Sequence, residues 1–218
     1  MRALTLGVAA AVLAAASAAA HAFPVFTATA NLDPTAQIAS NFNPTPAVAV
    51  PIGTALSVAN IQVGGTEAGR VTYQLLGFEA SFTNWLFSAG GATGVFNNKN
   101  TALTTSFTDP TVYLPGQTIA FGFGVDGTSA TANCSGGSPF NCVFNGSNRA
   151  TEVNFALLRE SASSYLVFLN DSGNNRDVDW DDMVVRITIS AVPEPGTYAL
   201  LGVGLAMFGL IARRGRRL

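Results

Sequence analysis

The residues best suited to chemistry are acidic, and they gather between positions 170 and 182. Five of these thirteen residues are Asp and three are Asn. Calcium takes about six to eight hard oxygen ligands, which alternating Asp residues in a turn can supply. The pattern predicts a structural calcium ion held by carboxylates of this stretch: Asp171, Asp177, Asp179, Asp181 and Asp182.

A solvated turn explains the same residues without an ion. Asp and Asn satisfy backbone groups in turns through their own side chains. The stretch also lacks the Gly at the sixth loop position and the flanking helices of an EF-hand. Clustered negative charge without a cation, however, destabilises a fold by repulsion between like charges. Both interpretations stay open at this point.

Catalysis would have to rest on carboxylates alone. The only histidine, His21, lies in an N-terminal segment that we expect to be removed. The mature chain therefore lacks a Ser-His-Asp triad, a Cys-His pair and His-ligated zinc. Candidates for a glycosidase-like acid/base pair exist, but nothing in the sequence pairs them: Glu79, Asp109, Asp126 and Glu152. We expect no enzymatic activity.

Aromatic residues give a rival function, a carbohydrate-binding module with a structural calcium ion. Jelly-roll domains often bind glycans on aromatic platforms, and four candidates are Tyr73, Tyr113, Trp85 and Trp180. Aromatic side chains in a β-sandwich serve more often as core. The sequence leaves the platform and the core as alternatives.

Two cysteines, Cys134 and Cys142, enclose a short Gly- and Pro-containing loop. In an oxidising compartment we expect them to form one disulfide, which would stabilise the fold by about 2–3 kcal/mol. A metal-binding pair or two free thiols are the alternatives.

The elements that must position these residues are short strands separated by Gly, Asn, Asp and Pro. Such a series, with no sustained helical periodicity between residues 23 and 191, predicts an all-β ectodomain, a jelly-roll-like β-sandwich. Residues 23–51 are expected to form an irregular lead-in or an edge strand. The predicted strands are Leu56–Val63, Val71–Ala80, Phe82–Phe87, Ala102–Thr108, Gln117–Val125, Glu152–Arg159, Ser164–Asn170 and Met183–Ser190.

The N-terminal residues 1–22 have the pattern of a secretory signal peptide. A positive Arg2 precedes an apolar run over Leu4–Ala20, and small residues flank His21 at a cleavage site. We expect export by the Sec machinery and cleavage by signal peptidase before Phe23. An uncleaved membrane anchor is the alternative.

The C-terminal residues 192–218 combine three features. Val192 is followed by Pro193, Glu194 and Pro195, then by an apolar segment over 198–212 and a basic tail: Arg213, Arg214, Arg216 and Arg217. A helix of these fifteen apolar residues rises about 22 Å, short of a hydrocarbon core of about 30 Å unless flanking residues help. We expect a single transmembrane helix with its basic tail in the cytoplasm. A plain tail anchor is the alternative.

This three-part tail resembles the PEP-CTERM sorting signal. In that family, exosortase, a membrane-embedded cysteine protease, recognises and processes the tail. The resemblance implies a Gram-negative-type bacterium, a precursor held in the inner membrane with its ectodomain in the periplasm, and a final place at the cell surface or outside the cell. It also implies an association with exopolysaccharide and biofilm. Residues 71–80 with Thr83 and Asn84, and residues 177–185, further resemble PEP-CTERM ectodomains of unknown activity, a likeness that supplies no reaction.

The predicted ectodomain is more negatively charged than the chain as a whole. Residues 23–191 contain twelve Asp or Glu against six Lys or Arg, a net charge of −6, whereas the whole chain has −2. A domain with this excess of negative charge is poorly suited to neutralising phosphates. We therefore exclude nucleic acid as a partner.

Overall fold

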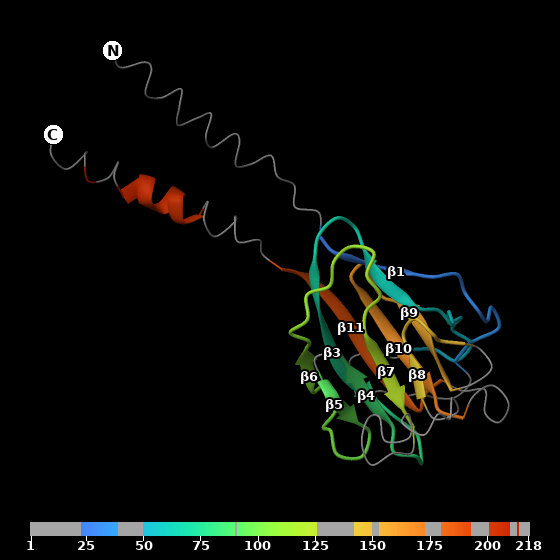
Figure 1. The fold of residues 1–218 in the computed structure, drawn as a ribbon. Helices are drawn as coiled ribbons and strands as arrows, with labels where there is room; N and C mark the ends of the chain where they lie inside the picture. The colour runs from blue at the N-terminus through green and yellow to red at the C-terminus, as the bar shows by residue number, and fades with distance from the viewer. Residues whose placement is uncertain are drawn as a thin grey trace.

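The computed structural model describes residues 23–38, 50–89, 91–125, 142–149, 153–172, 180–192, 201–209 and 213, with side chains at 91–93 excepted. Within these ranges the chain forms β-strands that assemble into three antiparallel sheets, together with a short helix at 201–209 (Figure 1). The all-β class predicted for the ectodomain is confirmed.

The largest sheet has five strands in the order β6-β3-β11-β10-β9. Strand β11 is central, and its register against β10 places Val185 opposite Val167. The five strands are β6 (Ser106–Thr108), β3 (Gly69–Gly77), β11 (Met183–Ala191), β10 (Ser164–Asn170) and β9 (Asn154–Arg159).

A four-stranded sheet has the order β5-β4-β7-β8, and a further pair joins β1 to β2. The strands of the four-stranded sheet are β5 (Gly91–Asn97), β4 (Trp85–Ser88), β7 (Phe121–Gly124) and β8 (Cys142–Phe144). The pair consists of β1 (Val25–Ala28) and β2 (Ile61–Gly64).

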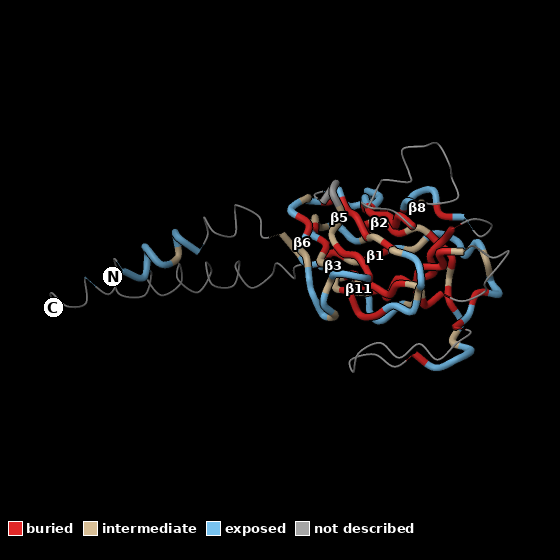
Figure 2. Tube along the Cα trace, turned by 90° about the horizontal axis from the view of Figure 1, so that it is seen from below, coloured by how far each residue is buried: buried red, intermediate tan, exposed pale blue. Residues whose placement is uncertain are grey.

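The main core lies between the two larger sheets. Phe155 of β9 packs against two rings of β7, with centroid distances of 5.3 Å to Phe121 and 6.0 Å to Phe123. Tyr73 of β3 also reaches Phe121, at 6.1 Å. Figure 2 shows buried residues running through the strands and exposed residues in the surrounding turns. Burial of these apolar faces against each other is the main stabilising contribution to the fold.

A second core covers part of the outer face of the five-stranded sheet. Side chains from the segments 36–38 and 50–58 pack there onto Leu166 and Phe168 of β10 and onto Trp180. Strand β10 is therefore buried on both faces, which explains its continuous apolar sequence. Residues 23–51 were predicted to form an irregular lead-in or an edge strand, and within them Val25–Ala28 form strand β1. The packing of residues 36–38 onto the outer face of the sheet is a feature that the sequence pattern did not reveal.

Most predicted strands are present with shifted ends. The bounds of Ser164–Asn170 are confirmed, and the strand beginning at Met183 extends one residue further, to Ala191. Strands β5 and β8 were not predicted, because two Gly residues weaken the pattern of β5 and β8 has three residues. The jelly-roll-like connectivity is wrong, since β9, β10 and β11 pair in sequence order as a meander.

The two ends of the chain fall largely outside the described residues. The predicted signal peptide, 1–22, is not described. Of the predicted transmembrane helix over 198–212, residues 201–209 are described as helical, with exposed apolar side chains such as Leu205 and Phe208. In the described parts of the chain we find no helix with the length and apolar character needed to span a membrane.

Candidate functional site

Four acidic residues lie at one end of the five-stranded sheet, which we call the acidic end: Glu79, Asp171, Asp181 and Asp182. Glu79 follows β3, Asp171 follows β10, and the other two precede β11. Antiparallel pairing of β11 with both β3 and β10 brings these three chain segments to the same edge. The fold therefore assembles carboxylates that are far apart in sequence.

Glu79 and Asp181 form the first pair within the acidic end. The backbone N–H of Glu79 donates to the carbonyl of Asp181 over 3.0 Å. Their carboxyl groups are also within hydrogen-bonding distance, and the charge of Asp181 raises the pKa of Glu79, with that hydrogen bond and burial adding to the shift. Asp181 is buried whereas Glu79 is exposed. The neighbouring Asp181 therefore disfavours the charged form of Glu79.

Asp171 and Asp182 form the second pair. The backbone N–H of Asp171 donates to Oδ2 of Asp182 over 2.8 Å. The carboxylate of Asp171 itself accepts the hydroxyl of Ser172 at 3.1 Å and the side-chain amide of Asn84 at 2.7 Å. These contacts fix the buried Asp171 side chain in one orientation.

Asn84 connects the four-stranded sheet to the acidic end, because it immediately precedes β4. Its backbone N–H donates to Oδ1 of Asn98 at 2.9 Å, and its carbonyl accepts the N–H of Asn98 at 3.1 Å. The side chain has no exposed surface, yet Oδ1 of Asn84 lacks a hydrogen-bond partner. The sequence included Asn84 only in a stretch that resembles PEP-CTERM ectodomains, and this likeness gave no reason to connect it with the acidic residues.

The predicted calcium ligands are thus only partly located. The structure brings Asp171, Asp181 and Asp182 to one end of the sheet, whereas Asp177 and Asp179 lie outside the described residues. Among the residues that the structure describes, no three Asp, Glu, His or Cys side chains form a group able to hold a metal ion. Calcium binding stays a prediction.

The candidate acid/base carboxylates have separate partners. Asp109 is fully buried and accepts the Tyr113 hydroxyl at 3.3 Å and the Thr111 N–H at 2.8 Å. Burial, followed by the charge of Asp109, raises the pKa of Tyr113 to about 12. Glu79 lies instead beside Asp181, and Asp126 and Glu152 are outside the described residues.

Three of the four candidate platform aromatics belong to the core. Tyr73, Tyr113 and Trp180 are buried, and the indole N–H of Trp180 donates to Oδ1 of Asn154 over 2.8 Å. Trp85 of β4 is half-buried. The core alternative is therefore the correct one for those three residues.

Of the two cysteines, Cys142 is disulfide-bonded and lies on β8, an outer strand of the four-stranded sheet. Cys134 lies outside the described residues, so its pairing with Cys142 stays a prediction.

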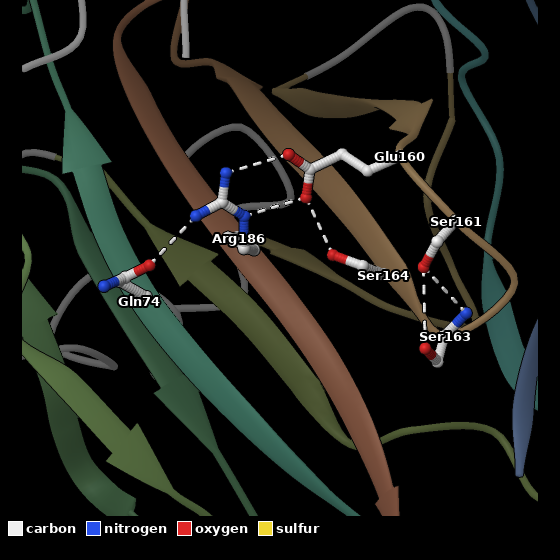
Figure 3. A network of polar contacts seen from close by, with 6 residues as sticks. All are labelled: Gln74, Glu160, Ser161, Ser163, Ser164 and Arg186. Atoms are coloured by element: carbon white, nitrogen blue, oxygen red, sulfur yellow. Dashed lines mark hydrogen bonds and ion pairs between the residues drawn. The ribbon is translucent and has the colours of Figure 1, made fainter. Parts of the chain in front are cut away.

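A polar network on the outer face of the five-stranded sheet lies near the start of β10, away from the acidic end. Arg186 donates to both carboxylate oxygens of Glu160 at 2.8 Å and to Gln74 at 3.1 Å (Figure 3). Burial raises the pKa of Glu160, but hydrogen bonds from Arg186 and Ser164, together with the charge of Arg186, lower it overall. Every strong donor in this network is used within the sheet, so we interpret it as structural.

Comparison with known proteins identifies the C-terminal tail. Residues 191–217 match the PEP-CTERM protein-sorting motif. No curated protein and no solved structure matches the chain. The chain therefore carries the sorting signal of an exosortase substrate, which implies an exported, membrane-anchored precursor with exosortase as its processing partner. The motif begins at Ala191, the last residue of β11.

Proposed function

We propose that the chain is a non-enzymatic structural protein of the cell envelope or extracellular matrix, delivered by exosortase. The sorting motif at residues 191–217 is the observation that carries this proposal. The association with exopolysaccharide and biofilm is part of the proposal and follows from the family resemblance.

The junction between domain and tail supports delivery of a folded unit. Strand β11 is hydrogen-bonded on both sides and ends at Ala191, where the motif begins. The next residue, Val192, donates its N–H to the carbonyl of Ala68 at 3.2 Å. The ordered sheet thus extends to the first residues of the signal, and exosortase acts beside a folded domain.

The surroundings of the carboxylates support a role without catalysis. Buried Asp109 is hydrogen-bonded to Tyr113, and Glu79 lies beside Asp181. Catalysis of glycoside hydrolysis needs two carboxyl groups flanking one substrate. The described candidates are instead engaged with neighbouring protein groups. Glycan binding on an aromatic platform has less support, because three of its four candidate residues are buried.

Cell fractionation tests the proposal. In a host with exosortase, the ectodomain should become accessible to protease added outside the cell. In a host without it, or with Glu194→Ala, the precursor should stay in the inner membrane. The control variant Glu160→Ala loses a Glu side chain from the ectodomain instead of from the sorting motif, and it should be sorted like the wild type. Equal surface exposure with and without exosortase would contradict the proposal.

A further inference from the structure

We propose that one end of the domain docks on the lipid surface of the inner membrane while the precursor is anchored there. We call it the tail end, because β11 leads from it into the sorting motif. The tail end carries three exposed apolar side chains, Phe23, Val112 and Leu114. The inference rests on the proposed function, in which the sorting tail holds the precursor in the membrane until exosortase acts. It adds the orientation of the domain and the surface that meets the lipid.

The chain enters and leaves the described domain at the tail end. Strand β1 begins at Val25, which pairs with Gly64 at the end of β2. Strand β11 ends at Ala191, which pairs with Gly69 at the start of β3. A short connection joins Gly64 to Gly69, so the start of β1 and the end of β11 lie at the same end of the fold (Figure 1). The acidic end lies at the opposite ends of β3 and β11.

Val112 and Leu114 lie beside the point where β11 ends. Between them, Tyr113 exchanges backbone hydrogen bonds with Gly69 at 2.9 and 3.0 Å. Because Gly69 also pairs with Ala191, only β3 separates these residues from the last residue of β11. Val112 is 39% exposed and Leu114 is 53% exposed, whereas Tyr113 is buried. Two apolar side chains thus project from the tail end into solvent.

Phe23 lies on the β1 side of the tail end, and its side chain is 73% exposed. Its backbone carbonyl is so close to Gly65, which follows β2, that a Cβ at Gly65 would lie 3.2 Å from the oxygen. The charged residues on either side of Gly69 are Glu67 and Arg70, which have opposite signs. The tail end therefore has exposed apolar groups with balanced charge beside them, whereas anionic lipid headgroups would repel the acidic end.

The length of the linker selects the membrane as the partner of this surface. Val192 donates its N–H to Ala68, and eight residues separate it from the helix at 201–209, whose apolar side chains are exposed. Eight residues span at most about 30 Å, whereas a domain of the length of residues 23–191 is about 40 Å across. An anchored domain therefore cannot turn its acidic end to the lipid. The linker also holds the tail end at a high effective concentration beside the headgroups, where Phe and Leu side chains insert readily.

Fluorescence of the full-length precursor in vesicles of phosphatidylethanolamine and phosphatidylglycerol, without exosortase, tests the docking. An environment-sensitive thiol label is attached to Leu114→Cys or, as a matched control, to Phe78→Cys, an exposed position beside the acidic end. The native Cys142 is disulfide-bonded, and labelled wild type gives the background. The label at position 114 should emit at shorter wavelength in vesicles and be quenched by spin-labelled headgroups, and the label at position 78 should show neither effect. Adding Val112→Ser to Leu114→Cys should weaken both effects.

Co-flotation of the same samples with the vesicles separates this inference from the proposed function. A precursor that floats with the vesicles, while labels at Leu114→Cys and Val112→Cys both report water, would overturn the docking and leave the anchored precursor intact. Equal quenching at Phe78→Cys would also overturn it, because the domain would then have no preferred orientation. A precursor that does not float would contradict the proposed function and this inference together.

Discussion

The side-chain amide of Asn84 donates to the carboxylate of Asp171 over 2.7 Å, and this bond joins the two large sheets at the acidic end. Asn84 leads into β4 of the four-stranded sheet, whereas Asp171 follows β10 of the five-stranded sheet. The two residues are 87 positions apart in the chain. A contact between buried side chains thus complements the apolar packing between the layers.

Removing this contact should weaken the domain. Asn84→Ala leaves the buried Asp171 carboxylate with one donor fewer, and we expect the free energy of unfolding in EDTA to fall by about 1–3 kcal/mol. Urea denaturation measures the change. Asn100→Ala, at an exposed turn position, is the control and should unfold like the wild type. An unchanged midpoint for Asn84→Ala would show that the bond contributes nothing.

Phe155 should be a principal contributor to the stability of the main core. Its ring joins β9 to Phe121 and Phe123 of β7 and has no exposed surface. Phe155→Ala should lower the free energy of unfolding by about 3–5 kcal/mol, whereas Phe82→Ala, at an exposed position, should have little effect. Equal losses in the two variants, measured by chemical denaturation, would contradict the packing described for the two sheets.

The ion pair between Glu160 and Arg186 should make stability depend on pH. The folded-state pKa of Glu160 lies below the ordinary value of 4.5, so the pair stabilises the fold above 4.5 and loses this effect as pH falls through the lowered value. Both side chains are a quarter exposed, which limits the contribution to about 0.5–1 kcal/mol. The stability difference between wild type and Glu160→Gln should therefore vanish in acid. A difference that persists at low pH would refute this assignment.

The disulfide should join Cys134 to Cys142 within one chain. Cleavage under non-reducing conditions should yield a peptide pair carrying both residues, and reduction should lower the free energy of unfolding by about 2–3 kcal/mol. Alkylation of both thiols in freshly isolated protein would show instead that they are unpaired.

Local patterns in the sequence were sufficient to predict the buried strands. The apolar run over Ser164–Asn170 and the alternation after Met183 correspond to β10 and β11, because burial of one or both faces constrains each residue type. Strands β5 and β8 escaped prediction because Gly-rich or very short strands have weak patterns. The strand order could not be predicted either, because pairing between strands that are distant in the chain produces no local sequence pattern.

The acidic end, too, could be predicted only in part from the sequence. The Asp residues were conspicuous in the sequence, since five lie within thirteen positions. Glu79 and Asn84 were not connected to them, because only the pairing of β3 with β11 and the approach to β4 bring these residues together. The indole of Trp180, conspicuous within the same stretch, lies in the second core instead of on the surface.

The C-terminus of the mature protein tests the central claim, sorting by exosortase, most directly. Mass spectrometry of protein isolated from a host with exosortase should find a chain that ends within the matched motif, residues 191–217, and lacks the basic tail. The same measurement without exosortase should find the tail intact. A mature wild-type chain that still extends to Leu218 in the presence of exosortase would contradict the account.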